Sequence, residues 1–232
     1  MNVGEELMAI EAARRLSNDT VCFVGIGLPS TAANLARRTH APDCVLVYES
    51  GTIGAKPSEL PLSIGDGELA ETADSVVSVP EMFAYWLQGG RIDVGFLGAA
   101  QIDRHGNLNS TVIGAYDSPT VRLPGGGGAP EIATSCRDVF VMLRQSPRTF
   151  VERLDFTTSV GDRVRVVITD LGVLEPVDGQ LTLVATHPGV SADDARAATG
   201  WDLRVADDLR ETRAPTADEL DALRSLRTKG AG

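Results

Sequence analysis

The chain has 232 residues, of which 43% are hydrophobic and only 5% aromatic, and its formal net charge is −11. This charge argues against nucleic acid as the main partner, although local cations or helix N-termini could still hold an anionic substrate. The three cysteines lie far apart and the three histidines form no i, i+4 pair. We therefore expect neither a disulfide framework nor a metal site.

The N-terminal segment and the apolar runs predict where the protein resides. Met1 to Leu16 is amphipathic and acidic, without the basic and apolar regions of a signal peptide. No apolar run approaches the roughly 18 residues that a membrane span needs. We therefore expect a cytoplasmic protein.

The first half of the chain begins with a repeating pattern of helix and strand. Apolar residues at helical spacing predict a helix over Glu5–Leu16. A strand at Thr20–Val24, a helix at Ser30–Arg38 and a strand at Val45–Tyr48 then form a βαβ unit. Such a unit predicts parallel pairing of the two strands.

The middle of the chain is less regular. Ser58–Asp74 is predicted to be irregular, Val76–Val79 to form a short strand, and Glu81–Gln88 to form a helix with Pro80 in its first turn. Asp93–Leu97 follows as a buried strand. The remaining predicted elements are strands at Asp138–Leu143 and Arg163–Thr169, an antiparallel pair (Leu171–Glu175 and Leu181–Thr186) around Asp178-Gly179, and helices at Val190–Ala198 and after Thr216. We therefore predict one α/β domain over residues 1–232, with an open, mostly parallel sheet flanked by helices.

Two glycine-containing segments are candidates for binding. Gly25 and Gly27 stand between a strand and a helix, where backbone N–H groups can meet a phosphate or carboxylate, although tight packing is an equally good reason for them. The run Gly125–Gly128 is either a flexible loop or a set of N–H groups facing a developing oxyanion. Pro130 and the apolar residues after it predict a helix directly behind that run.

A polar run follows the strand that ends at Leu97. Asp103 and His105 suit a turn, whereas Gln101 and Asn109 flank this turn and are the better ligand candidates. Turn chemistry alone also explains such a run.

Glu49 is the most informative single residue. It follows a strand of the predicted parallel sheet, and ligands bind at the carboxyl ends of such strands. Ser50 and Gly51 turn the chain sharply behind it. A desolvated and oriented carboxylate can attack an activated acyl group and form an anhydride. A structural glutamate in an ion pair or a cap is an equally good interpretation of this pattern.

Several segments together resemble a known family. In chain order they are GIGLPSTAANLA, HAPDCVLVYESG, FLGAAQIDRHGNLNSTVIG, GGGGAPEIA, THPGV and ATGW. They resemble the B subunit of family I coenzyme A transferases across nearly the whole chain. The likeness is greatest to the glutaconate CoA-transferase branch, which also includes 3-oxoadipate CoA-transferases. The resemblance implies the fold shared by CoA transferases and some sugar-phosphate isomerases.

The resemblance also implies roles for residues. Glu49 occupies the position of the family's nucleophile, and Gly128, followed by Gly127, is the first choice for an oxyanion-hole N–H. The remaining expected substrate or CoA contacts are Gly25, Gly27, Ser50, Gly51, Gln101, Asn109 and Gly126. Coenzyme A would be a substrate, with no tightly bound cofactor, and an A subunit would complete the active site in a hetero-oligomer. Relatives are expected to carry a longer segment near Val160–Arg163.

The implied reaction is a ping-pong transfer of CoA through glutamyl anhydride and glutamyl-CoA thioester intermediates. Succinyl-CoA is the expected donor and 3-oxoadipate the expected acceptor, with glutaconate as the alternative. Two further functions stay open. One is an acyl-CoA hydrolase or decarboxylase in which Glu49 is a general base or an electrostatic group. The other is a non-enzymatic module that binds a nucleotide or a sugar phosphate.

Overall fold

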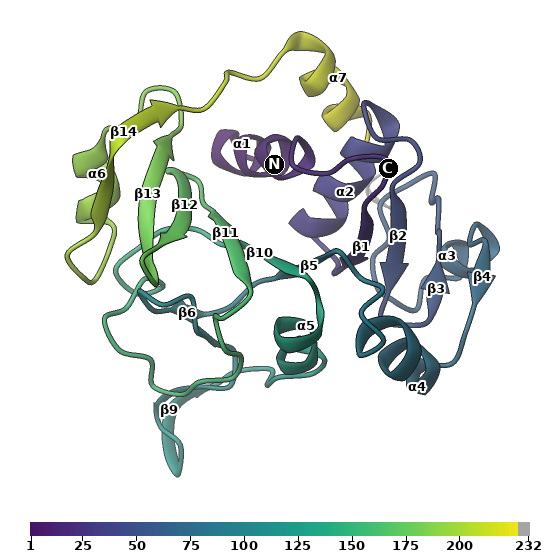
Figure 1. Cartoon of the computed structure of the whole chain (residues 1–232), viewed down its shortest axis with the longest axis horizontal. Helices are drawn as coiled ribbons and strands as arrows, with labels where there is room; N and C mark the ends of the chain where they lie inside the picture. Colours follow the sequence, from purple (N-terminus) through teal and green to yellow (C-terminus); the bar gives the residue numbers. More distant parts are fainter. Residues whose placement is uncertain (227–232) are drawn as a thin grey trace. The chain divides into compact units, whose positions relative to one another are not determined.

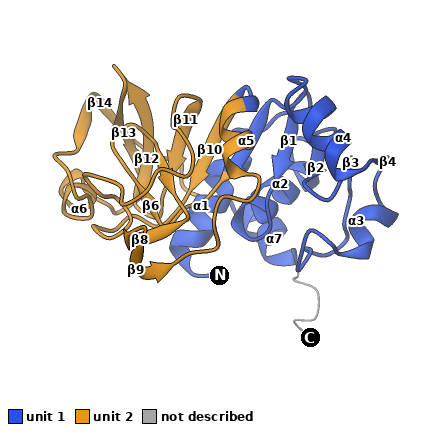
Figure 2. Cartoon of the chain, turned by 90° about the horizontal axis from the view of Figure 1, so that it is seen from below, with its two compact units in different colours: residues 1–96, 135–137, 215–232 blue, residues 97–134, 138–214 orange. Residues whose placement is uncertain are grey.

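The computed structural model describes residues 1–226, which fall into two compact units (Figure 2). Unit 1 comprises Met1–Phe96, Ser135–Arg137 and the residues from Pro215 on, and unit 2 comprises Leu97–Thr134 and Asp138–Ala214. Each unit is thus assembled from separate stretches of chain. The single domain over residues 1–232 stays a prediction, and its last six residues lie outside the described part.

Unit 1 contains the predicted βαβ unit. Its elements are α1 (Val3–Ala13), β1 (Val21–Val24), α2 (Leu28–Arg38), β2 (Val45–Tyr48), β3 (Thr52–Ile53), α3 (Gly67–Glu71), β4 (Ser75–Val76), α4 (Val79–Glu81), the π-helix η1 (Met82–Leu87), β5 (Val94–Leu97), whose last residue begins unit 2, and α7 (Ala217–Ser225). The strand order is β5-β1-β2-β3-β4. As predicted, β1 runs parallel to β2, and it also runs parallel to β5.

Three helices of unit 1 pack together. Helix α1 lies against α2, α7 contacts both, and α2 packs on β1 (Figure 1). Asn2 and Glu5 form a capping box at the start of α1, and Thr216 and Glu219 form one at the start of α7. These reciprocal bonds satisfy N–H groups that have no partner inside the helix. The predictions of a first helix and of a capped last helix are confirmed.

The core of unit 1 lies between these helices and the sheet. Met8, Leu35 and Leu46 are at most 1% exposed, and Phe23 meets Phe83 edge to face at 6.3 Å between ring centroids. All three cysteines are buried, and none of them forms a disulfide within residues 1–226. None of the helices in residues 1–226 is both long enough and apolar enough to cross a bilayer.

Unit 2 is built around a mixed five-strand region and two small hairpins. Its elements are β6 (Gln101–Ile102), β7 (Leu108–Asn109), β8 (Val112–Ala115), β9 (Ser118–Arg122), α5 (Ala129–Ser135), β10 (Asp138–Met142), β11 (Val164–Ile168), β12 (Gly172–Val177), β13 (Gln180–Thr186), α6 (Ala192–Ala197) and β14 (Arg204–Glu211). The strand order is β14-β13-β12-β11-β10. The predicted antiparallel pair around Asp178-Gly179 is confirmed as β12 and β13, and the helix expected after Gly128 is α5.

Some elements differ from the prediction. Helix α3 lies within Ser58–Asp74, because Asp66 caps a short helical turn there. The strand expected at Val76–Val79 is β4 and ends at Val76, since Ser78 caps α4 instead. The hairpin β8–β9 and the strand β14 were not predicted.

Candidate active site

Glu49 stands on a tight turn at the carboxyl end of β2. The N–H of Gly51 donates to the carbonyl of Tyr48 at 2.9 Å, so that the turn closes around Glu49 and Ser50. Glu49 is half-buried, and within residues 1–226 its carboxylate has no hydrogen bond or ion pair. Within residues 1–226 the structure therefore does not support the alternative of a capping or ion-paired glutamate. A carboxylate in this position is left available to react with a ligand.

Only glycine fits at the end of this turn. Gly51 has φ = +102°, and a Cβ there would overlap the carbonyl oxygen of Val77. The N–H of Val77 in turn donates to the Gly51 carbonyl at 2.9 Å. The hydroxyl of Ser50 is shielded from solvent and lacks a hydrogen-bond partner in the described part of the chain. The Glu49 turn is thus fixed by its backbone, and Gly51 has a structural role whether or not it contacts a ligand.

The Gly25–Gly27 turn is next to Glu49. In the parallel pairing of β1 with β2, Val24 is opposite Tyr48, so Gly25 and Glu49 follow at the same level on adjacent strands. Adjacent strands lie about 4.8 Å apart. Gly27, with φ = +89°, is the N-cap of α2 and has no side chain to cap it. The register therefore places Gly25 and Glu49 at the same edge of the sheet, while their contact with ligand stays a prediction.

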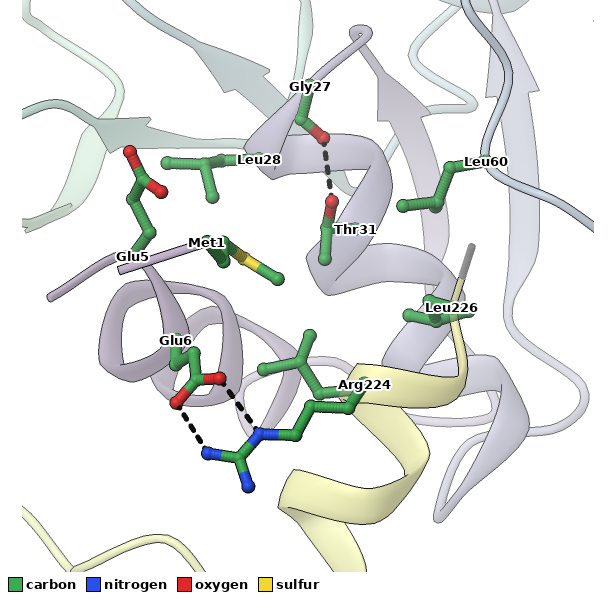
Figure 3. A pocket seen from close by; sticks show the side chains of 10 residues that line it. Met1, Glu5, Glu6, Gly27, Leu28, Thr31, Leu60, Arg224 and Leu226 are labelled. Atoms are coloured by element: carbon green, nitrogen blue, oxygen red, sulfur yellow. Dashed lines mark hydrogen bonds and ion pairs between the residues drawn. The ribbon is translucent and has the colours of Figure 1, made fainter. Parts of the chain in front are cut away.

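A pocket of about 580 Å³ opens at the start of α2 (Figure 3). Gly27, Leu28 and Thr31 line it, and the hydroxyl of Thr31 donates to the Gly27 carbonyl at 3.1 Å. On another wall Arg224 forms two hydrogen bonds, at 3.0 and 3.1 Å, with the carboxylate of Glu6. These bonds lower the pKa of Glu6. The residues that line this pocket do not include the turn that carries Glu49, so the pocket adjoins the start of α2 and not Glu49.

The glycine segment of unit 2 is held at its first residue. The N–H of Gly125 donates to the Ser110 carbonyl and the Ser110 hydroxyl donates back to the Gly125 carbonyl, both at 2.9 Å. The N–H groups of Gly127 and Gly128 have no hydrogen-bond acceptor within residues 1–226. They stand at the start of α5, where the helix dipole favours negative charge. This arrangement suits the predicted oxyanion role, which stays a prediction.

Gln101 and Asn109 are bonded to each other, as partners in the β6–β7 pair. The amide nitrogen of Asn109 donates to the side-chain oxygen of Gln101 at 2.7 Å, and the amide nitrogen of Gln101 donates to Asp155 at 2.9 Å. Asn109 is 0% and Gln101 is 6% exposed. Their ligand contact stays a prediction, and the geometry gives them a structural role that spacing alone did not indicate. Asp103 accepts bonds from the N–H groups of His105 and Asn107, as expected of a turn.

The sequence interpretation missed a buried polar contact of Tyr48, the residue before Glu49. The hydroxyl of Tyr48 lies 3.3 Å from that of Ser30 and accepts from the amide of Asn34 at 3.4 Å. Burial raises the pKa of the Tyr48 phenol, and the two hydrogen bonds oppose that rise only in part. The one signal in the sequence was a tyrosine that ends an otherwise aliphatic strand.

Comparison with known proteins agrees with the geometry. The family profile of the coenzyme A transferases matches residues 6–198. The chain belongs to this family. CoA-transferases use coenzyme A as a substrate, so the chain is part of an enzyme of CoA transfer and the non-enzymatic alternative is not supported.

One relative in sequence and two solved structures illustrate the range of the family. The chain is 58% identical to the B subunit of 3-oxoadipate CoA-transferase from Pseudomonas knackmussii over 243 residues, covering 97% of this chain and 94% of the relative. It superposes on glutaconate coenzyme A-transferase from Acidaminococcus fermentans with a TM-score of 0.90 at 30% identity, covering 99% and 96% of the two chains. The decarboxylase AibA/AibB gives a TM-score of 0.89 at 29% identity, with the same coverage. These matches confirm the predicted fold.

Relatives are expected to carry a longer segment near Val160–Arg163, and in this chain that segment is short. Near Val160–Arg163 the chain is closely packed, because the N–H of Gly161 donates to the side chain of Asn107 at 3.0 Å and a Cβ on Gly161 would overlap the backbone of Gly106. That segment therefore leads compactly into β11.

Proposed function

We propose that the chain is the B subunit of a CoA-transferase that moves CoA from succinyl-CoA to 3-oxoadipate. The 58% identity to the B subunit of a 3-oxoadipate CoA-transferase supports the acceptor. The observation that carries the proposal is the free carboxylate of Glu49, on a fixed turn at a carboxyl strand end. We place the enzyme in the cytoplasm and expect no tightly bound cofactor beside its CoA substrate.

Glu49 acts as the nucleophile in the first half of the reaction. Its carboxylate attacks the thioester carbonyl, the C–S bond breaks, and an acyl-glutamyl anhydride and CoA thiolate result. The thiolate then attacks the glutamyl carbonyl of the anhydride. This step releases the donor acid as its carboxylate and leaves a glutamyl-CoA thioester.

The second half reverses these steps with the acceptor. The carboxylate of 3-oxoadipate attacks the glutamyl-CoA carbonyl and expels CoA thiolate, which gives a new anhydride. The thiolate attacks the acceptor's carbonyl in that anhydride, so the new acyl-CoA leaves and the Glu49 carboxylate is restored. The thioester is conserved throughout, and no water is consumed.

The N–H groups of Gly128 and Gly127 stabilise the oxyanion of each tetrahedral intermediate. Within the described residues these N–H groups have no hydrogen-bond acceptor, so they are available to a ligand. They also directly precede α5. Removing one such donor typically lowers kcat about 10²–10³-fold. Gly126 lets the substrate approach, while Gly25, Gly27 and Ser50 contact CoA or the acid.

An A subunit completes the enzyme. The Pseudomonas relative is named as one subunit of its enzyme, and the two-component name AibA/AibB of a similar structure also supports a second chain. We propose that the active site includes residues of this partner and that the isolated chain has little activity.

A transfer assay tests the proposal. The chain is co-expressed with its partner, the A subunit, and incubated with succinyl-CoA and 3-oxoadipate, with glutaconate in a parallel reaction. We expect 3-oxoadipyl-CoA and succinate in equal amounts, and no activity in Glu49→Ala. Full activity of that variant would refute the role of Glu49.

The second candidate is hydrolysis or decarboxylation on the same scaffold, and the similarity to the decarboxylase AibA/AibB favours decarboxylation of the two. Product analysis separates the reactions. Hydrolysis releases free CoA thiol, decarboxylation releases CO₂, and transfer releases neither. Thiol release that matches substrate loss without any acceptor acid would favour the hydrolase.

A further inference from the structure

A buried polar cluster surrounds the hydroxyl of Tyr48, the residue before Glu49. It consists of Ser30, Asn34 and Tyr48, each at most 1% exposed. The Ser30 and Tyr48 hydroxyls are 3.3 Å apart, and the Asn34 amide donates to the Ser30 carbonyl at 2.9 Å and to the two hydroxyls at 3.3 and 3.4 Å. We call these three residues the hydroxyl–amide cluster.

This cluster joins the two segments that carry the proposed site in unit 1. Ser30 and Asn34 lie on α2, one turn apart, and α2 begins directly after the Gly25–Gly27 turn. Tyr48 is the last residue of β2, and its carbonyl closes the turn that presents Glu49. The cluster therefore links the start of α2 to the base of the nucleophile turn through side chains.

The cluster carries an energetic cost that an apolar core would avoid. The side-chain oxygen of Asn34 is buried and has no hydrogen-bond partner in residues 1–226. A buried acceptor without a partner destabilises the fold, whereas apolar groups of similar shape can replace a buried pair with little change. The neighbours Leu35, Leu46 and Val47 show that aliphatic packing is available at this level. Stability alone therefore does not account for three polar side chains here.

Directional bonds account for the cluster better. Apolar contacts allow a strand end to slide and rotate, whereas hydrogen bonds between groups of fixed geometry select one arrangement. We propose that Ser30, Asn34 and Tyr48 are positioning residues that hold the Glu49 carboxylate at one distance and angle from the Gly25–Gly27 turn. This inference rests on the proposed nucleophilic role of Glu49.

The experiment compares variants of the cluster with a matched control in the co-expressed complex. Tyr48→Phe and Ser30→Ala each remove one hydroxyl. Thr199→Val is the control in unit 2, because the Thr199 hydroxyl is also in buried hydrogen bonds: it accepts from the Gln145 side chain at 2.9 Å and donates to the Ala195 carbonyl at 2.8 Å. Rapid quenching and mass spectrometry give the rate at which CoA becomes attached to the Glu49 peptide. Steady-state assays give kcat and KM, and urea unfolding gives stability.

We expect Tyr48→Phe and Ser30→Ala to lower the rate of attachment and kcat about 10–100-fold, the effect of a small misplacement of a reacting group. KM for the acyl-CoA should stay within about threefold, because the bonds lost do not bind substrate. The attachment rate of the double variant should stay within about threefold of that of the slower single variant, because both changes break the same hydrogen-bond network.

The control separates positioning from stability. Thr199→Val should lower the unfolding midpoint to a similar degree while its attachment rate stays within about threefold of wild type, because Thr199 shares no hydrogen bond with the cluster. Cluster variants that attach CoA as fast as this control would overturn the inference and leave the proposed function intact. Wild-type enzyme that never attaches CoA to Glu49 would overturn the proposed function, and the inference with it.

Discussion

The Gly51→Ala substitution tests how the Glu49 turn is held. Gly51 has φ = +102°, which an L-residue with a Cβ adopts only at a cost of about 1–3 kcal/mol. The new Cβ would also overlap the Val77 carbonyl oxygen. Either the turn or the backbone at Val77, just after β4, must move, and the 2.9 Å bond from the Val77 N–H to the Gly51 carbonyl then weakens. That bond contributes about 1 kcal/mol.

Together these effects lower the free energy of unfolding by about 2–4 kcal/mol. Gly90→Ala is the matched control, because Gly90 also has positive φ, +70°, but a Cβ there meets nothing within 4 Å. Gly90→Ala should therefore lose only the backbone part, about 1–2 kcal/mol. Urea unfolding of both variants measures the difference.

The same substitution should displace the nucleophile. A shift of about 1 Å at the reacting group typically lowers the rate about 100-fold, so Gly51→Ala should lose most transfer activity while Gly90→Ala keeps it. If both variants lose equal stability and both keep full activity, then neither the contact with Val77 nor the fixed turn matters for catalysis.

The remaining predictions concern stability. Glu219 has its pKa lowered to about 2, first by its hydrogen bond to Arg14, so its ion pair stabilises the fold above pH 4.5 and is lost as the pH falls from 4.5 to about 2. In urea unfolding at pH 7, Glu219→Gln should therefore be less stable than wild type by about 1–2 kcal/mol, because solvent screens part of the interaction. The difference in stability should vanish near pH 2, and an unchanged difference at low pH would contradict this. Asn109→Ala leaves the N–H groups of Thr111 and Val112 without their buried acceptor and should lower the free energy of unfolding by at least about 2 kcal/mol. Asn109→Asp should not restore it, because the second carboxylate oxygen would face the Gln101 side-chain oxygen and the Val112 carbonyl, to which the Asn109 amide donates. Trp201→Ala removes a ring that is 7% exposed and stacks on Phe150 at 5.7 Å, so differential scanning calorimetry should show a loss of about 3–5 kcal/mol, and a loss below about 1 kcal/mol would mean that unit 2 repacks around the cavity.

The sequence predicted those parts of the fold whose signals are local. The β1–α2–β2 segment consists of short apolar runs bounded by glycine, and the predicted strand Val45–Tyr48 agrees with β2 at both ends. The position of Glu49 at a carboxyl strand end follows from that segment alone. By contrast, β14 has the sequence RVADDLRE and is mostly exposed at the edge of the sheet. It therefore lacks the alternation of apolar and polar residues that predicts a strand.

The parts of the site that the sequence did not predict are contacts between residues that lie far apart in the chain. Tyr48 meets Ser30, 18 positions earlier, and Gly51 meets Val77, 26 positions later. Spacing cannot indicate such pairs, because they depend on which helix covers which strand. Burial was equally hidden in the sequence, since Gln101 and Asn109 stand in a polar run that suggests solvent exposure, whereas the fold encloses both.

Covalent catalysis by Glu49 is the central claim, and peptide mapping tests it directly. The complex of this chain with its A subunit is incubated with succinyl-CoA without an acceptor, digested and analysed by mass spectrometry, with Glu49→Ala as the control. We expect the peptide that contains Glu49 to gain the mass of CoA, and borohydride to reduce the thioester at that residue. Turnover of succinyl-CoA with 3-oxoadipate and no modified Glu49 peptide under any quenching condition would contradict the proposed mechanism.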